Sequence, residues 1–362
     1  MGHRMIGRLA AALVAGALLT LALPVPAPAQ APRKVTFVFP TPVMDLRYSP
    51  ASVGIELGFF KEEGIEPTFQ TLAGSAAAIQ AVMAGQADLG TSTNEPAITS
   101  RQRDIPVRYF YEWYTKIIYR LGVPEASAIR TVADLRGKNI GIQSHASAAL
   151  PYARAVLRAA GLNPDTDVTF LPVGVGAQAA TALRGGQVDA LALWDTQYAG
   201  IENLGTKFRY FVHPQLANLS SGGLFSSDEW LKNNRDVAVR FGRAWAKAST
   251  FIFANPEAAI RIHWKIYPQT KPKGVSDAEA LKQATHVLRT VLEYHGREHK
   301  KNRAWGAFSP EEWQQYIEFL VREKVIPSSF PAAQIMTNEY IDAINDFAQD
   351  KVRALARDYK TN

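Results

Sequence analysis

The stretch GQADL at residues 85–89 decides the fold, because its pattern returns as GQVDA at residues 186–190. In both copies an alanine-rich stretch with helical spacing precedes the glycine, and an apolar stretch of strand character completes the unit. Glycine ends helices readily because it adopts positive φ angles without a steric penalty. Each copy therefore predicts a helix, a tight turn and a buried strand.

The match between the two copies extends upstream of the pentapeptides. Both units are expected to begin with a strand, a helix and a second strand, at 35–39, 50–63 and 66–72 in the first and at 139–142, 147–160 and 168–173 in the second. The order β-α-β-α-β implies a parallel sheet with right-handed crossovers. The sequence therefore predicts an α/β fold with one such unit in each of two lobes.

The boundaries of these lobes follow from the segments between the units. At 362 residues the chain exceeds the usual size of a single core. Extended stretches at 116–119 and 207–212 are expected to carry the chain out of the first lobe and back. Lobe one would then comprise residues 32–120 and 213–362, with a set of C-terminal helices, and lobe two residues 121–212. Two adjacent crossings form a hinge, about which such lobes can close on a ligand.

The first residues predict export. Arg4 and Arg8 give a positive start, residues 9–23 are apolar, and Ala29 and Ala31 are small residues at the positions that a signal peptidase reads. The apolar run is shorter than the about 20 residues that a membrane span needs. We therefore expect residues 1–31 to be a cleaved signal peptide, and the mature protein to be periplasmic.

Composition excludes several classes of protein. The chain has no cysteine, which excludes a lipoprotein, a disulfide scaffold and a thiolate metal centre. The net charge of +7 is spread along the chain without the basic stripe that nucleic-acid binding requires. His295 and His299 have the spacing of a helical metal site but lack an acidic partner and an apolar shell. We expect these histidines on a solvated surface, and we expect no metal and no cofactor.

Candidate binding residues lie where the parallel strands end, because ligands of open α/β sheets gather beyond the carboxyl ends of strands. These segments supply thirteen candidates: Asp45, Tyr48, Gly74, Ser75, Thr93, Asn94, Glu95, Ser144, His145, Ser147, Gly174, Trp194 and Asp195. Asn94 and Asp195 fall at the same register of the repeat, so the two lobes would present them to one shared cleft.

The chemistry of these candidates leaves two classes of ligand open. Helix N-termini with Arg47 and His145 favour a sulfonate or carboxylate. Aromatic side chains with Glu95 and Asp195 favour a planar ligand that carries donors, such as an aminopyrimidine. Each serine can instead serve only to cap its own helix, and each carboxylate can instead form a salt bridge.

Several motifs resemble one family of transport proteins: GFFKEEGIE at 58–66, AGQAD at 84–88, DLRGKNIG at 134–141 and the stretch 189–195. The chain resembles the substrate-binding proteins of ABC importers for sulfonates, taurine, nitrate and thiamine-pyrimidine precursors. The resemblance implies a type II periplasmic-binding fold, and a permease with its ATPase as partners. It also implies ligand contacts at the positions of Tyr48, Ser75, 93–95, Ser144 and Trp194.

The function expected from the sequence is therefore binding without catalysis. The chain is interpreted as a monomeric periplasmic solute-binding protein that delivers a small organic anion or an aromatic or heteroaromatic solute to a permease. One alternative is a sensory protein that presents its ligand to a chemoreceptor or histidine kinase. A second is an enzyme similar to the pyrimidine synthases of the same fold, against which the lack of cysteine and the export signal both count.

Overall fold

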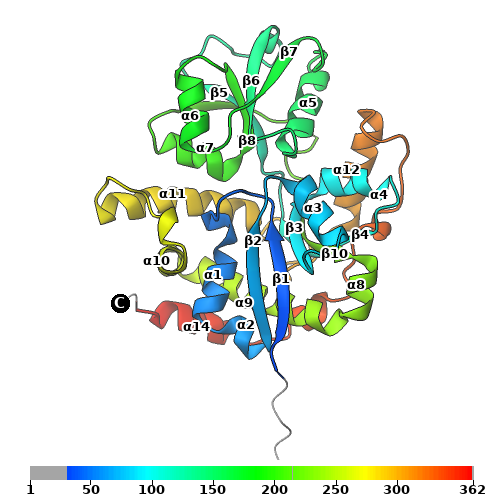
Figure 1. Ribbon diagram of the computed structural model, residues 1–362, viewed down its shortest axis with the longest axis vertical. Helices are drawn as coiled ribbons and strands as arrows, with labels where there is room; N and C mark the ends of the chain where they lie inside the picture. The colour runs from blue at the N-terminus through cyan, green and yellow to red at the C-terminus, as the bar shows by residue number, and fades with distance from the viewer. Residues whose placement is uncertain (1–30, 214, 361–362) are drawn as a thin grey trace, which may run out of the picture. The chain divides into compact units, whose positions relative to one another are not determined.

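The computed structural model describes residues 31–213 and 215–360, and residues 32–362 form one compact unit. The expected signal peptide lies outside the described residues, apart from its last position. Two five-stranded sheets form the framework, in the orders β2-β1-β3-β10-β4 and β7-β6-β8-β5-β9 (Figure 1). The expected α/β fold with two sheets is confirmed.

The first sheet is mixed. Its strands are β1 (Arg33–Phe39), β2 (Ile65–Thr71), β3 (Leu89–Thr93), β4 (Val107–Tyr114) and β10 (Gly222–Ser227). Strand β1 pairs in parallel with β2 and β3, while β10 lies antiparallel between β3 and β4. The second sheet repeats this order.

The second sheet consists of β5 (Tyr119–Pro124), β6 (Lys138–Ile142), β7 (Val168–Pro172), β8 (Ala190–Trp194) and β9 (Phe208–Phe211). Strand β6 pairs in parallel with β7 and β8, while β5 lies antiparallel between β8 and β9. The internal repeat of the sequence is therefore a repeat of sheet topology.

The aspartate of each repeated pentapeptide explains why the pattern recurs. The Asp88 carboxylate accepts from the backbone N–H of Thr36 at 2.8 Å, and Asp88 N donates to Thr36 O at 2.9 Å. Asp189 makes the same pair of bonds with Asn139, at 2.9 and 2.8 Å. In both units the aspartate thus fixes the start of the third strand beside the first strand.

The helices of the two units follow the predicted order, with one interruption. They are α1 (Ser49–Glu56), α2 (Phe59–Glu62), α3 (Ser75–Met83), α4 (Asn94–Arg101), α5 (Ala149–Ala159), α6 (Ala177–Arg184) and α7 (Asp195–Glu202). Short 3-10 turns occur at η1 (Leu46–Tyr48) and η2 (Ala133–Leu135). The single helix expected over 50–63 is broken at Gly58, which has a φ angle of 74° that ends α1 and starts α2.

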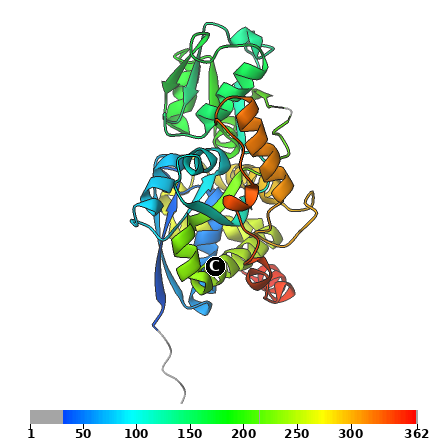
Figure 2. The same ribbon diagram turned by 90° about the vertical axis from the view of Figure 1, so that its right-hand side faces the viewer.

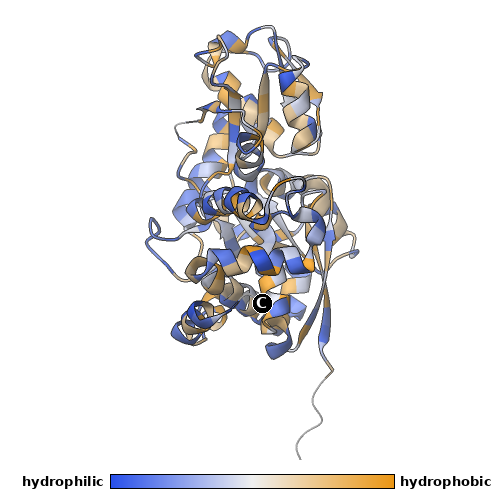
Figure 3. Ribbon diagram, turned by 90° about the vertical axis from the view of Figure 1, so that its left-hand side faces the viewer, coloured by the Kyte–Doolittle hydropathy of each residue, from blue (hydrophilic) through white to orange (hydrophobic). Residues whose placement is uncertain are grey.

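The C-terminal part is helical, as expected. It contains α8 (Asp228–Asn233), α9 (Arg235–Ala254), α10 (Pro256–Ile266), η3 (Pro268–Thr270), α11 (Asp277–His295), α12 (Pro310–Arg322), η4 (Ala332–Gln334), α13 (Ile341–Ile344) and α14 (Gln349–Asp358). Phe241 and Trp245 of α9 stack on Phe37 with ring centroids 5.2 and 5.6 Å apart, which anchors this helix in the core of the first sheet. Hydrophilic and hydrophobic residues alternate along these helices (Figure 3), the pattern of helices with one buried face. Across 31–213 and 215–360, none has the length and apolar character to span a bilayer.

The chain passes between the sheets twice, at 115–118 and over the described residues 212–213 and 215–221. The strand predicted over 116–119 is wrong except for Tyr119, because the backbone here bonds to helices rather than to a sheet. The Thr115 N–H donates to Tyr294 O at 3.1 Å, and Ile118 O accepts from Asp195 N at 3.0 Å. The extended stretch predicted over 207–212 is confirmed as β9.

Helix α12, orange in Figure 2, packs against the second crossing. The ring of Phe319 lies 4.7 Å from that of His213, and Glu312 accepts from the Ser220 N–H at 3.0 Å. The backbone between the two sheets is thus supported by the C-terminal helices.

Candidate functional site

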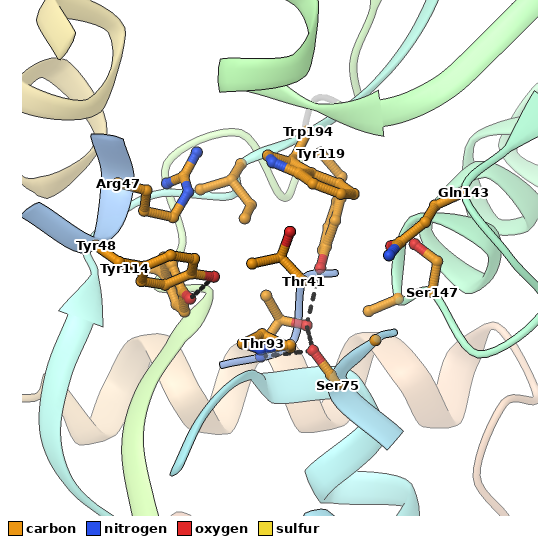
Figure 4. A pocket seen from close by; sticks show the side chains of 14 residues that line it. Thr41, Arg47, Tyr48, Ser75, Thr93, Tyr114, Tyr119, Gln143, Ser147 and Trp194 are labelled. Atoms are coloured by element: carbon orange, nitrogen blue, oxygen red, sulfur yellow. Dashed lines mark hydrogen bonds between the residues drawn. The ribbon is translucent and has the colours of Figure 1, made fainter. Parts of the chain in front are cut away.

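A cavity lies between the strand ends of the two sheets, and we call it the central cavity (Figure 4). The space between its walls is about 340 Å³ including the open side. Its walls consist of Pro40, Thr41, Arg47, Tyr48, Gly74, Ser75, Thr93, Tyr114, Ile118, Tyr119, Gln143, Ser147, Ala148 and Trp194. Residues predicted from both repeat units therefore meet in one place.

One side of the cavity carries two sets of hydroxyl groups, from the first sheet and its loops and from Tyr119 of the second sheet. Ser75 is the first residue of α3, and its Oγ lies 3.3 Å from Thr93 Oγ1. Thr93 Oγ1 lies 3.2 Å from the Tyr119 hydroxyl, and the Tyr48 hydroxyl lies 3.4 Å from that of Tyr114. Hydroxyls donate or accept by rotating, so this wall can hydrogen-bond ligand oxygens.

The wall from the second sheet is formed by Gln143, Ser147, Ala148 and Trp194. Gln143 directly follows β6, is 7% exposed, and its Nε2 has no hydrogen-bond partner within the protein. Ser147 Oγ accepts from the Ala149 N–H at 3.3 Å, at the start of α5. A buried amide without a partner is costly, so Gln143 is a donor available to a ligand.

A buried ion pair crosses from one sheet's loops to the other's beside this cavity. Arg47, in η1, pairs with Asp195, the first residue of α7, and each side chain is 1% exposed. The Asp45 carboxylate accepts from the Thr196 hydroxyl at 3.1 Å and from the Arg47 N–H at 2.9 Å. We call Asp45, Arg47, Asp195 and Thr196 the polar bridge. These contacts hold the two sets of loops together.

His295 completes the surroundings of Arg47, and its predicted exposure is wrong. It is 1% exposed, its Nε2 lies 2.7 Å from Arg47 Nη1, and its ring lies 4.1 Å from that of Trp113. Burial and the neighbouring guanidinium hold the pKa of His295 well below its usual value, so the neutral ring accepts from Arg47. His299 remains exposed, as expected. No group of three metal-ligating side chains occurs among the described residues.

Seven of the thirteen predicted residues lie outside the walls of the central cavity. Asp45 and Asp195 belong to the polar bridge, and the Asn94 amide donates to Ser220 O at 2.8 Å. The others are buried Glu95, half-buried Ser144, exposed His145, and Gly174, which lines a separate surface hollow. The carboxylates expected to accept from a ligand are therefore turned away from the cavity.

Several residues of the cavity wall are not among the thirteen predicted from the sequence. Arg47 was considered for its charge without being chosen, while Thr41, Tyr114, Tyr119, Gln143 and Ala148 were not among the candidates. Thr41 and Gln143 closely follow β1 and β6, so the strand-end rule could have included them. Tyr119 opens β5 after the first crossing, where the sequence gives no signal of a cavity.

Burial raises the pKa of Glu95 to about 8, so this carboxyl is protonated at neutral pH in the folded protein. In the unfolded chain it ionises near its ordinary value, so the folded state binds more protons between those two values. Stability should therefore fall as pH rises through this window. Glu95→Gln should remove this dependence and stabilise the protein at pH 8, by an amount on the order of a few kcal/mol.

Urea unfolding of wild type and Glu95→Gln from pH 5 to pH 9 measures this effect. The two stability curves should converge toward pH 5 and separate as pH rises. Curves that run parallel over the whole range would contradict the burial of a neutral Glu95.

The sequence of this chain matches a known protein family. The family model described as NMT1/THI5 like matches residues 47–259, which is more than half of the chain. The chain belongs to the NMT1/THI5-like family. The matched region of this family member contains Arg47, the first repeat unit without its opening strand, the whole second unit, and most of the cavity wall.

Individual proteins are similar to this chain in sequence or in structure. The riboflavin-binding protein RibY of Chloroflexus aurantiacus is 22% identical over 305 residues, covering 83% of this chain and 84% of that protein. The structure of the alkanesulfonate-binding protein SsuA from Xanthomonas axonopodis pv. citri bound to MOPS has a TM-score of 0.62 at 20% identity, covering 85% of this chain and 99% of that one. The desulfurization enzyme DSZB matches with a TM-score of 0.51 at 16% identity, covering 86% and 98%. These structures share the fold.

Proposed function

We propose that the chain is the periplasmic substrate-binding protein of an ABC importer, and that the central cavity holds a small organic anion. The observation that carries this proposal is the set of groups lining the cavity. Among the described residues that line the cavity, Arg47 alone has a formal charge at neutral pH, and none is an aspartate or glutamate. The cavity therefore offers a ligand hydrogen-bond donors and no carboxylate from its wall.

The helices add to this preference for negative charge. Ser75 begins α3, and Ser147 and Ala148 immediately precede α5, so one helix N-terminus from each repeat unit faces the cavity. The free N–H groups and the dipole of a helix N-terminus stabilise anions without a formal positive charge. Because Arg47 shares its charge with Asp195, these neutral donors carry much of the recognition.

The body of the ligand is proposed to be compact and planar. Trp194 and Tyr48 line the cavity with aromatic side chains, while Ile118 and Ala148 are apolar. An acid group held at the hydroxyl wall would leave a small ring or short chain against Trp194. The relatives named for riboflavin and alkanesulfonate support a solute of this kind, with either a heteroaromatic ring or a sulfonate group.

Binding rather than catalysis fits the groups in the cavity. The chain has no cysteine, and the hydrogen-bond partners of Ser75 are hydroxyl and backbone groups of Thr93. His295, which lies beside the polar bridge, accepts a hydrogen bond from Arg47 and not from a serine. No activated nucleophile is thereby formed in the wall.

We further propose that the two sheets with their helices are lobes that close on the ligand, with the bounds expected from the sequence. The crossings at 115–118 and 212–221 would form the hinge, and delivery to a permease and its ATPase would follow closure. The cavity wall contains residues from both proposed lobes, and a ligand that touches both lobes favours the closed arrangement. This supports the proposal that closure depends on the ligand.

A thermal-shift screen tests the proposed function with compounds matched in shape and different in charge. Benzenesulfonate and benzoate are compared with benzenesulfonamide, benzamide and benzylamine, and ethanesulfonate, taurine and lumichrome extend the series. Anions should raise the melting temperature, and a ligand at 100 times its Kd contributes about 2.7 kcal/mol. Stabilisation by the amine or the neutral amides alone would contradict the anion assignment.

A further inference from the structure

A second hollow lies on the far side of the polar bridge, and we call it the side groove. Its walls consist of Pro42, Val43, Met44, Asp45, Leu46, Thr71, Val175, Gly176, Ala177, Thr196, Gln197, Gly200, Asn203, Leu204, Trp264, Gln269, Thr270, Pro272, Gln283, Ala284 and Val287. The space between them is about 1680 Å³ including the open side. No residue of the side groove lines the central cavity.

The polar bridge separates these two spaces. Arg47 lines the central cavity, while Asp45 and Thr196 line the side groove. The bond from Thr196 to Asp45 and the ion pair between Arg47 and Asp195 run between the two proposed lobes. A molecule in the side groove would therefore touch both lobes without entering the central cavity.

The chemistry of the side groove differs from that of the cavity. Aliphatic and aromatic side chains form much of its wall, including Met44, Val175 and Trp264. Val43 and Leu204, from opposite lobes, are 47% and 52% exposed. Large apolar side chains left to solvent on both sides of one hollow are typical of a binding surface.

The polar groups of the side groove are mostly neutral and mostly satisfied. Gln197 Oε1 accepts from the Gly176 N–H at 2.8 Å, and Asn203 Nδ2 donates to Gln283 O at 3.0 Å. Asp45 is the only ionisable wall residue, and its carboxylate already accepts from Thr196 and the Arg47 N–H. No cation lines the groove to bind an acid, and the engaged carboxylate does not offer a site for an amine.

We propose that the side groove binds a neutral, largely apolar small molecule, separate from the anion of the central cavity. Apolar walls with a few polar groups at a domain interface are the usual features of small-molecule sites. Because walls from both lobes would be buried against it, this molecule favours the closed arrangement. It would thereby raise the affinity of the central cavity, and the effect is reciprocal.

Gly200 provides a direct test, because it lies on α7 in the wall of the groove. A Cβ added there meets nothing within 4 Å, and its φ angle is not in the left-handed region. Gly200→Trp should therefore fill the groove without straining the backbone. Arg184→Trp is the matched control, since Arg184 is exposed at the end of α6 and lines neither space.

The probe is N-phenyl-1-naphthylamine, an uncharged aromatic molecule whose fluorescence rises in apolar surroundings. Wild type and Arg184→Trp should bind it saturably at one site. Gly200→Trp should bind it at least tenfold more weakly while keeping the wild-type circular dichroism spectrum. Leu204→Glu places a charge on an exposed rim position of the side groove and should also weaken binding of the probe. It serves as a second variant if Gly200→Trp does not fold.

Two results would overturn the proposal. One is equal probe affinity in wild type and in both groove variants. The other is a wild-type dimer in light scattering that becomes monomeric in Gly200→Trp, which would assign the groove to a second copy of the chain. Failure here leaves the proposed function untouched, because anion titrations of Gly200→Trp report on the central cavity separately.

Discussion

Arg47→Met is expected to weaken binding in the central cavity by a factor of roughly 10² to 10³. The substitution leaves the Asp195 carboxylate buried without a cation, and breaking a buried pair in this way costs about 3–5 kcal/mol. Separation of the lobes would return Asp195 to water. The substitution therefore mainly raises the free energy of the proposed closed arrangement. The unliganded chain can open, so it should melt close to the wild-type temperature.

The double variant Arg47→Met with Asp195→Leu separates the two roles of the arginine. Replacing both charges by apolar groups removes the uncompensated carboxylate, so closure should largely recover. The cavity still lacks the donors that Arg47 would offer to the proposed ligand, among them the Nε that has no partner in the protein, so an intermediate affinity is expected. Calorimetric titration with the best anion of the thermal-shift screen measures all three proteins. Wild-type affinity in Arg47→Met would contradict the role of the polar bridge.

Gly74→Ala is expected to weaken ligand binding about 10- to 100-fold. A Cβ on Gly74 would lie 2.6 Å from the carbonyl oxygen of Ala146, which belongs to the loop after β6 in the other proposed lobe. Overpacking of this kind costs about 1–3 kcal/mol, and it arises only when the lobes are closed. The φ angle of 120° at Gly74 adds backbone strain that is independent of closure.

Gly85→Ala is a control for the general cost of an alanine at a positive φ angle. Gly85 has a φ angle of 70°, and an added Cβ there meets nothing within 4 Å. This variant should lose stability by about 1 kcal/mol, the usual penalty of a left-handed alanine, and should bind the ligand as wild type does. Equal losses of affinity in the two variants would show that strain, and not contact between lobes, limits Gly74→Ala.

The repeated framework could be predicted from the sequence because its signals are local. The glycine of each pentapeptide acts within a few residues, as a helix end. The aspartate bonds to a strand 52 or 50 residues away, and the sequence reveals it only because the pentapeptide recurs. The strand-end rule then selected Ser75 and Thr93 in one sheet and Ser147 and Trp194 in the other, because the ends of parallel strands within a sheet share an edge. No long-range contact had to be known for either inference.

The polar bridge could not be predicted, because its partners are far apart in the sequence. Arg47 meets Asp195 and His295, which are 148 and 248 residues away. The spacing of His295 and His299 describes only their own helix, whereas the burial of His295 depends on how the end of α11 meets the first crossing. There Thr115 Oγ1 donates to Tyr294 O, and the ring of His295 packs on Trp113.

The same contacts explain the error at residues 116–119. The residue types in this segment favour a strand, and pattern alone cannot reveal that Thr115 and Ile118 bond to α11 and α7. Competition between local preference and tertiary hydrogen bonds decided the structure there.

A crystal structure with the most stabilising compound of the thermal-shift screen tests the central claim most directly. The compound should occupy the central cavity, with its acid oxygens within hydrogen-bond distance of Ser75, Thr93 or Gln143 and its body against Trp194. A compound bound elsewhere, or one whose acid group points away from these donors into solvent, would contradict the assignment of the cavity to an organic anion.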